Sequence, residues 1–353
     1  MLIFLSQQLE NELKTEYRKS EQTAQAIQNI AQARAQGDHI ISGDATCLEY
    51  IISLKELNQS TKNIFQIISN EQSQIGSLHK NLEFYVEINS LNNTISKNKN
   101  SNQTIIEIPL HRFSKNDLVQ PTFLIGENLL DCHLYLTYSR WLSRSHWNQR
   151  LPSKLNAILI PGGGDTTEKL LNHLSQDGRY FSLCLTDSDI KYPGGNIGET
   201  TKKCQKLTLK EISHHLTIPV RASENLLSPE QIHQVLNIDH TRNILLNNLK
   251  KITRFRNTDA WLYFPLKEGI RPIIGPHQKN SRDEYWQITA YANDSLENEF
   301  LYPGISTDLL KWTVDYLKNY DPEKIKDSNL ISAWTKISTT VIAWTCASEP
   351  IRA

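Results

Sequence analysis

Acidic residues follow each of four short apolar runs in the second third of this sequence. The runs and their acidic residues are 122–125 (TFLI) before Glu127, 157–160 (AILI) before Asp165, 181–186 (FSLCLT) before Asp187 and Asp189, and 218–221 (IPVR) before Glu224. Carboxylates gathered at one place raise each other's pKa unless a cation lies between them. Oxygen ligands without His or Cys suit Mg²⁺ or Mn²⁺ rather than zinc. Such sites are typical of enzymes that act on phosphate esters.

The segments between these runs predict the elements that must position the carboxylates. Residues 129–147, 166–174 and 199–216 carry apolar residues at helical spacing. Short apolar strands that alternate with helices are typical of a parallel sheet covered on both faces. Ligands bind such sheets at the carboxyl ends of the strands. The sequence therefore predicts an α/β domain with its acidic residues at one edge.

Two of these motifs, in this order, resemble those of Toprim domains. Phe123-Leu-Ile-Gly-Glu127 looks like the first motif, and Leu185-Thr-Asp187-Ser-Asp189 looks like the second. The glycine turn at 160–164 lies between them, as in the same fold. Asp131, four residues after Glu127, and Glu224, after the fourth run, resemble further acidic positions of OLD-like nucleases and related phage-defence effectors. One departure is Asn128, where many family members have glycine.

The resemblance, which covers residues 121–229, implies a fold and a function. The fold is a Toprim domain, a parallel-sheet, Rossmann-like α/β fold. Glu127 would act in acid–base chemistry and could also ligate metal, Asp187 and Asp189 would hold Mg²⁺ (or Mn²⁺), and Asp131 and Glu224 are candidates for a second ion. The implied function is metal-dependent endonucleolytic cleavage of DNA or RNA in bacterial phage defence. The alternative is a catalytically inert Toprim scaffold that senses or recruits nucleic acid within a larger complex.

Several of these features also have a purely structural interpretation. Asp131 and Glu224 could be ordinary acids in the first turn of a helix, favoured by the helix dipole. The segment 161–167 (PGGGDTT) could bind phosphate through its backbone or could be a tight turn that packs a strand against the site. It lacks the Walker A pattern. The Pro-Gly-Gly at 193–195 is either a loop that moves over the site or a simple turn.

Two groups of basic residues are candidates for nucleic-acid binding. The first lies on the predicted helix after the Asp pair, and the second lies further along the chain. The groups are Lys203, Lys206 and Lys210, and then Lys250, Lys251, Arg254 and Arg256 with the neighbouring Arg242. Solvated helix faces also produce such patterns, whereas cations beside an acidic metal site suit a phosphate backbone.

The rest of the chain predicts helical regions on both sides of the α/β domain. We expect a helical arm or interaction domain at 1–100, the Toprim domain at 118–229 and a mainly helical region at 230–353. The arm either packs on itself or binds a partner, which would be a regulatory protein or a second copy. Residues 92–103 are polar and low in complexity, which predicts a loop or linker.

Composition restricts the class and the compartment. The sequence contains 38 basic residues (Lys plus Arg) and 38 acidic residues (Asp plus Glu). The overall charge therefore does not indicate a charged partner such as nucleic acid. The 5 cysteines show no CxxC spacing, which predicts reduced and mostly buried thiols. Neither a signal peptide nor an apolar run of membrane-spanning length is present in this sequence. We therefore expect a cytoplasmic protein with no membrane partner.

Overall fold

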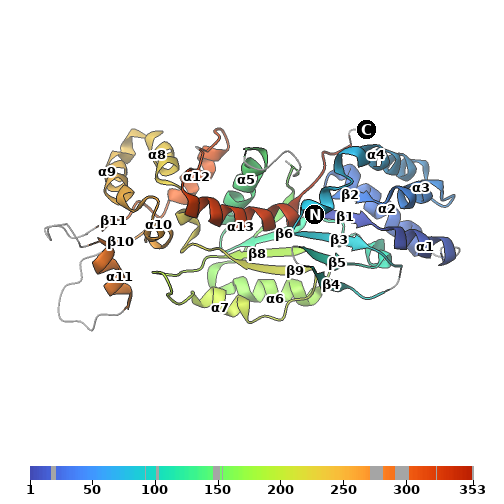
Figure 1. Cartoon of the computed structure of the whole chain (residues 1–353), viewed down its shortest axis with the longest axis horizontal. Coiled ribbons are helices and arrows are strands. Elements are labelled where there is room, and N and C mark those ends of the chain that lie inside the picture. Colours follow the sequence, from blue (N-terminus) through green and yellow to red (C-terminus); the bar gives the residue numbers. More distant parts are fainter. Residues whose placement is uncertain are drawn as a thin grey trace.

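A computed structural model of the protein contains two α/β sheets and a largely helical C-terminal region (Figure 1). It describes residues 1–16, 21–91, 93–100, 103–145, 152, 154–270, 281–290, 302–322 and 324–351. Across these ranges, none of the helices combines the length and apolar character needed to span a bilayer. All 5 cysteines are buried and free, as the sequence predicted.

The central sheet has four parallel strands, and it confirms the α/β prediction. In spatial order they are β7 (Ala157–Pro161), β6 (Thr122–Gly126), β8 (Ser182–Thr186) and β9 (Ser213–Thr217). The chain passes from β6 to β7 on one side and then returns past β6 to β8. The strand order therefore reverses between β6 and β8, and at such a point the adjacent connections leave on opposite faces and open a crevice.

Helices cover both faces of this sheet. On one side α5 (Leu129–Ser145) packs on β6 and β7, and the long α13 (Ser328–Thr345) packs on α5. On the other side lie α6 (Thr167–Asp177) and α7 (Glu199–Gln205) (Figure 1). This arrangement buries most side chains of the inner strands β6 and β8, whereas the edge strand β7 stays partly exposed.

The fourth strand differs from the sequence prediction, which placed it at 218–221 after a helix at 199–216. The helix ends at Gln205, and β9 begins at Ser213. The strand is polar in sequence, but His214 stacks on Trp344 of α13 with ring centroids 5.9 Å apart and also contacts Phe84. Partners distant in sequence thus cover an edge strand that its own residues do not reveal.

The prediction of a helical arm at 1–100 is wrong, because this region contributes strands to a five-stranded sheet. The strands in spatial order are β2 (Ile40–Gly43), β1 (Leu2–Leu5), β3 (Phe84–Ile88), β5 (Thr104–Glu107) and β4 (Ser96–Lys99). Only β4 is antiparallel. Helices α1 (Gln7–Glu16), α2 (Glu21–Gln36), α3 (Ala45–Ser53) and α4 (Gln59–Ile75) connect the first three strands. Strands of four or five buried residues are too short to show a period of two.

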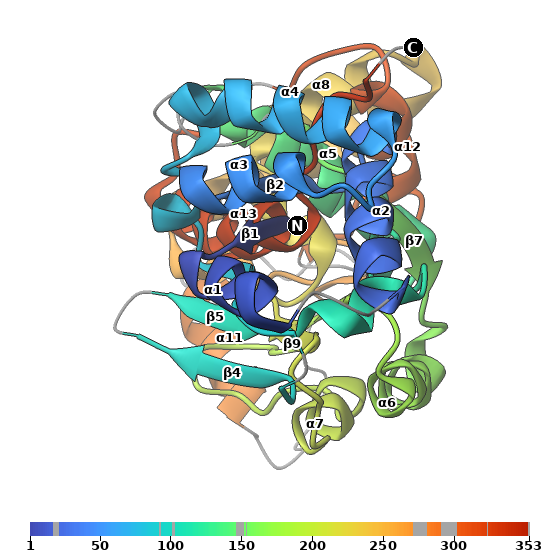
Figure 2. The same cartoon turned by 90° about the vertical axis from the view of Figure 1, so that its right-hand side faces the viewer.

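The predicted linker at 92–103 includes the edge strand β4, whose side chains are largely exposed. Figure 2 shows β4 at the free edge of this sheet, with α3 and α4 stacked over β1 and β2. Polar edge strands are common because they resist pairing with other chains. The sheet therefore continues past residue 100 as far as Glu107.

The C-terminal region packs against both sheets. Its helices are α8 (Pro229–Asn237), α9 (Asn243–Ile252), α10 (Asp259–Tyr263), α11 (Ser281–Ala290), α12 (Leu309–Leu317) and α13, and β10 (Gly269–Ile270) pairs with β11 (Tyr302–Pro303). Helix α13 bridges the two sheets, because Thr340 bonds Glu83 beside β3 and the carbonyl of Trp344 accepts from Thr122 of β6. One apolar core runs through both sheets and these helices.

Candidate functional site

The site begins at the ends of β6 and β8, where the order of the strands reverses. Glu127 directly follows β6, and Asp187 directly follows β8. The backbone N–H of Asp187 donates to Oε1 of Glu127 at 3.3 Å. Adjacent parallel strands thus bring together two carboxylates that are distant in sequence, at the edge where open α/β sheets bind ligands.

Asn128 begins the helix that follows Glu127. Its Oδ1 accepts from the N–H groups of Leu130 and Asp131 at 2.8 and 3.1 Å, and Oδ2 of Asp131 accepts from the N–H of Asn128 at 3.0 Å. This reciprocal pair is a capping box, which satisfies donors at the helix start. Asn128 therefore has a structural role here. Asp131 has both a capping role and a place in the site.

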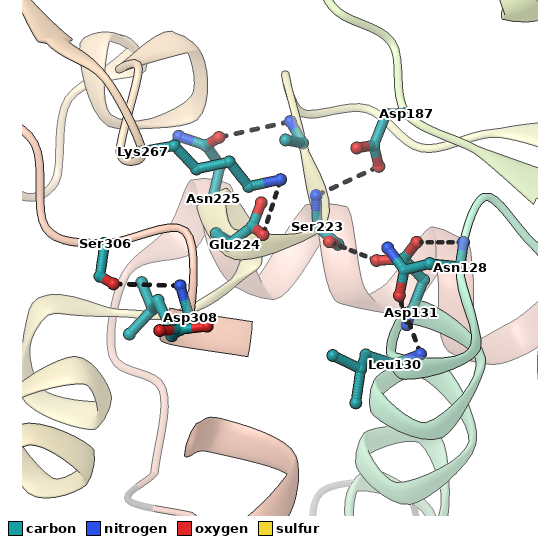
Figure 3. Close-up of polar contacts among 12 residues, drawn as sticks. Asn128, Leu130, Asp131, Asp187, Ser223, Glu224, Asn225, Lys267, Ser306 and Asp308 are labelled. Atoms are coloured by element: carbon teal, nitrogen blue, oxygen red, sulfur yellow. Dashed lines mark hydrogen bonds and ion pairs between the residues drawn. The ribbon is translucent and has the colours of Figure 1, made fainter. Parts of the chain in front are cut away.

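The segment after β9 closes the site from the side. In the short helix η5 (Ser223–Leu226), the N–H of Ser223 donates to Asp187 Oδ1 at 3.2 Å, and its hydroxyl donates to Asp131 Oδ1 at 2.7 Å (Figure 3). Asn225 anchors this turn by donating to the carbonyls of Trp261 and Phe264. Ser223 therefore links the two buried aspartates.

Glu224 meets a lysine from the C-terminal region. Its Oε1 lies 2.9 Å from Nζ of Lys267, and Figure 3 shows this pair beside Ser223. Its Oε2 is buried and has no hydrogen-bond partner. The sequence analysis missed Lys267, because no local pattern connects this lysine to carboxylates that precede it by more than 40 residues.

Asp189 lies at the rim of the site and not within the buried group. It is exposed and has a positive φ of 54°, which is unusual for a residue other than glycine. Gly198 packs against it: a Cβ at Gly198 would lie 2.2 Å from Oδ2 of Asp189. A glycine at 198 is thus required for the observed position of the Asp189 carboxylate.

Burial and crowding raise the pKa values of three carboxyl groups in the site, those of Glu127, Asp131 and Asp187. Burial, followed by the charges of Asp189 and Asp131, raises the pKa of Glu127 to about 7. Burial also raises the pKa of Asp187 well above its ordinary value, and Asp131, Glu127 and Glu224 add to this effect. Burial alone would lower the pKa of Lys267, but Glu224 and the two aspartates raise it. Without a further cation, Glu127 and Asp187 therefore favour their protonated, neutral forms, because Lys267 alone does not offset burial and crowding.

The carboxylate oxygens of this site are the type of ligand that a hard divalent cation prefers. The converging acceptors are carboxylates, and Oε2 of Glu224 is a buried acceptor without a hydrogen-bond partner, while Oε1 of the same carboxylate pairs with Lys267. Among the residues that the structure describes, no three acidic, His or Cys side chains form a group that could hold an ion as they stand.

The glycine turn after β7 has a structural role. The N–H of Gly162 donates to the carbonyl of Gly126 at 2.7 Å, and those of Gly163 and Gly164 donate to the carbonyl of Glu127 at 2.9 and 3.3 Å. Since these donors are satisfied within the protein, they do not face a phosphate. The turn fixes the backbone of Glu127, in agreement with the second of the two interpretations of this motif.

The first basic group does not form one helix face at the site. Helix α7 ends at Gln205, so Lys206 is its C-cap and Lys210 lies beyond it. Nζ of Lys210 donates to the carbonyl of Gln176 at the end of α6, at the opposite edge of the sheet from the carboxylates. The prediction that these lysines share a helix face was wrong because Leu207 and Leu209 continue the apolar pattern but pack as a loop against the small core beneath α6.

The second basic group lies on and after α9, which packs mainly on α8 and β11. Arg256 pairs with Glu230 at 2.6 Å, and Arg254 donates to the hydroxyl of Tyr302 at 2.5 Å. Lys250 and Lys251 are exposed at the end of the helix. The two arginines thus make contacts within the C-terminal region. The two lysines form part of its solvated surface.

No protein-family model, curated protein or solved structure matches this chain. The geometry of the site therefore carries the functional argument. Four of the predicted acidic residues converge at one buried edge and a fifth lies at its rim, whereas Lys210, Arg254 and Arg256 contact other parts of the chain. The converging residues are Glu127, Asp131, Asp187 and Glu224, with Asp189 at the rim.

Proposed function

We propose that this protein is a Toprim-type nuclease that hydrolyses phosphodiester bonds of DNA or RNA with Mg²⁺ or Mn²⁺. The observation that carries the proposal is the buried Oε2 of Glu224, which has no hydrogen-bond partner and lies in one site with Glu127 and Asp187, whose pKa values are raised. Such a group is unfavourable for folding alone, and a divalent cation would offset the repulsion.

The residues of the site divide by their surroundings. Glu127, with a pKa of about 7, is suited to exchanging a proton at neutral pH. Asp187 and Asp189, together with Glu127, would hold one ion, and Asp131 and Glu224 would serve a second. When bound, the ion would stabilise the negative charge that develops on the phosphate.

The neighbouring polar groups hold these side chains in place. Ser223 fixes Asp187 and Asp131, while the ammonium of Lys267 lies close enough to interact with both aspartates as well as with Glu224. Substrate would approach from the side of Asp189, because the other aspartates are almost completely buried.

One observation favours a second candidate, an inert scaffold that recruits nucleic acid. Lys267 already supplies a cation to Glu224, and no preformed metal-holding group exists among the described residues. In that case the lysine would permanently replace an ion, and the protein would bind nucleic acid without cutting it. A role in phage defence is proposed from the Toprim resemblance alone.

Cleavage of supercoiled plasmid and of labelled RNA by purified protein separates the two candidates. We expect Mg²⁺ or Mn²⁺ to support cutting, and Glu127→Gln and Asp187→Asn to lower the rate at least ~100-fold, the scale of losing a major transition-state contact. Asp315→Asn, at an exposed position of the packed helix α12, is the matched control and should cut at the wild-type rate. Cutting that is unchanged in the two site variants would contradict the nuclease proposal, and binding without any cutting would favour the scaffold.

A further inference from the structure

A cavity opens beside Asp189, on the exposed side of the site. Its volume is about 590 Å³. Its walls are formed by the segment that follows β8, by the segment that follows β9 and by helix α11. The side chains that bear on its chemistry are Asp189, Lys191, Tyr192, Arg221, Glu268 and Arg282. Cavities of this size bind single small molecules or one unit of a polymer.

Two guanidinium groups from separate elements line this cavity. The backbone of Arg221 is fixed on both sides, because its N–H donates to Leu262 and its carbonyl accepts from Asp189. Its side chain is mostly buried and has one distant carboxylate partner, Glu268 at 3.4 Å. Arg282 of α11 is exposed and makes no ion pair with the described residues. Burial lowers the pKa of Arg221, and the repulsion of Arg282 lowers it further, against the effect of Glu268.

The Pro-Gly-Gly motif forms a turn that places an aromatic ring in the same cavity. The N–H of Gly195 donates to the carbonyl of Tyr192 at 2.9 Å, and Gly194 has a φ of 77°. A Cβ at Gly195 would lie 3.2 Å from the ring of Tyr192, so the ring rests on this glycine. Trp286 of α11 donates to the carbonyl of Lys191 at 3.0 Å. The turn and α11 are thus joined, and the walls of the cavity are preformed.

We propose that this cavity binds one unpaired nucleotide of the substrate strand, next to the phosphate that is cut. The two arginines fit the phosphate and sugar, and Tyr192 offers a face on which the base can stack. A base inside a duplex is paired and stacked, so it cannot enter a cavity of this kind without being turned out. The substrate class is therefore a single strand, or a duplex opened at the cut site. This inference rests on the proposed nuclease function.

Metal-free binding tests the cavity independently of cleavage. Fluorescence anisotropy would measure the affinity for labelled oligothymidylate and oligouridylate of about 16 nucleotides, and for a blunt duplex of the same length. Wild type should bind at least one single strand more tightly than the duplex. Tyr192→Leu should weaken single-strand binding about tenfold, the scale of losing one stacked base. Arg282→Gln should weaken it and lower the slope of log affinity against log salt by about 0.7.

The matched control is Arg179→Gln, an exposed arginine beside the amino end of β8, which should bind as wild type does. Equal affinity for duplex and single strands, or wild-type affinity in both cavity variants, would overturn the inference. Single-strand preference that depends on Tyr192 and Arg282 in a protein without Mg²⁺-dependent cutting would keep the inference and overturn the nuclease function. If both variants cut blunt duplex at the wild-type rate, the nuclease function would stand and the single-strand inference would be overturned.

Discussion

Replacing Glu127 by glutamine should make the folded protein more stable while removing its activity. Glu127 is partly buried among other carboxylates, which raises its pKa to about 7. The glutamine side chain would keep an oxygen that can accept the N–H of Asp187, the one hydrogen bond to this side chain among the described residues. The change therefore removes a poorly placed charge and little else.

The magnitude follows from the difference between the folded and the unfolded pKa. The unfolded value is near 4.5, so the folded state holds its proton up to a higher pH than the unfolded state. Stability is then lost as pH rises from about 4.5 to about 7, and the loss stays constant above that range. A shift of this size corresponds to at most about 3.4 kcal/mol at 1.36 kcal/mol per pKa unit, and partial exposure of the group reduces this to about 2 kcal/mol.

Urea unfolding of metal-free wild type and Glu127→Gln would measure this difference. We expect the variant to be about 2 kcal/mol more stable at pH 8 and equal to wild type near pH 4. Added Mg²⁺ should narrow the gap at pH 8, since only the wild type has the full set of ligands. A variant that is less stable than wild type at pH 8, or a difference that does not change with pH, would refute the electrostatic reasoning.

Three further changes test the surroundings of the site. Lys267→Met should destabilise the metal-free protein by about 2 kcal/mol in urea because Glu224 would be left as a buried, unpaired charge, and adding Glu224→Gln should restore most of the loss. Gly198→Ala should displace Asp189 and lower the cleavage rate at least ~10-fold with an unchanged circular dichroism spectrum, since a 1 Å misplacement alone can cost more. Mg²⁺ at tenfold its Kd should stabilise wild type by about 1.4 kcal/mol in a thermal unfolding assay, but not Asp187→Asn.

The central sheet could be predicted because β6, β7 and β8 are apolar in sequence, and β6 and β8 are largely buried on both faces. Strands of this kind are continuous apolar runs, and β6, β7 and β8 lie where such runs predicted them. Because parallel strands end at one edge, the acidic residues after them had to lie close together. The convergence of Glu127, Asp131 and Asp187 was thus accessible from sequence.

Features that depend on contacts between distant segments were not predictable. The polar strand β9 needs Trp344 for cover, and Lys267 reaches Glu224 only because the C-terminal region folds back over the sheet. The lysines at 203–210 were assigned to one helix because their spacing does not show where α7 ends. These misses concern polar residues whose environment comes from another part of the chain, whereas the apolar amino-terminal strands were missed because they are short.

The amino-terminal strands change what can be expected of residues 1–100. Strand β1 is fully buried, and the apolar core continues from it into the central sheet and α13. Removal of this region would expose that core, so we do not expect the remainder to fold alone. A partner or a second copy could still bind the outer surface of this region, which stays a proposal.

Sequencing of DNA and RNA ends in cells that express the wild type or Asp187→Asn tests the central claim most directly. Asp187 is nearly buried at the junction of β6, β8 and η5, and Asn has almost the same shape, so the variant should accumulate as wild type does. The account predicts new ends in DNA or in RNA with the wild type and none with the variant. Identical end profiles from the two proteins at equal abundance would contradict it.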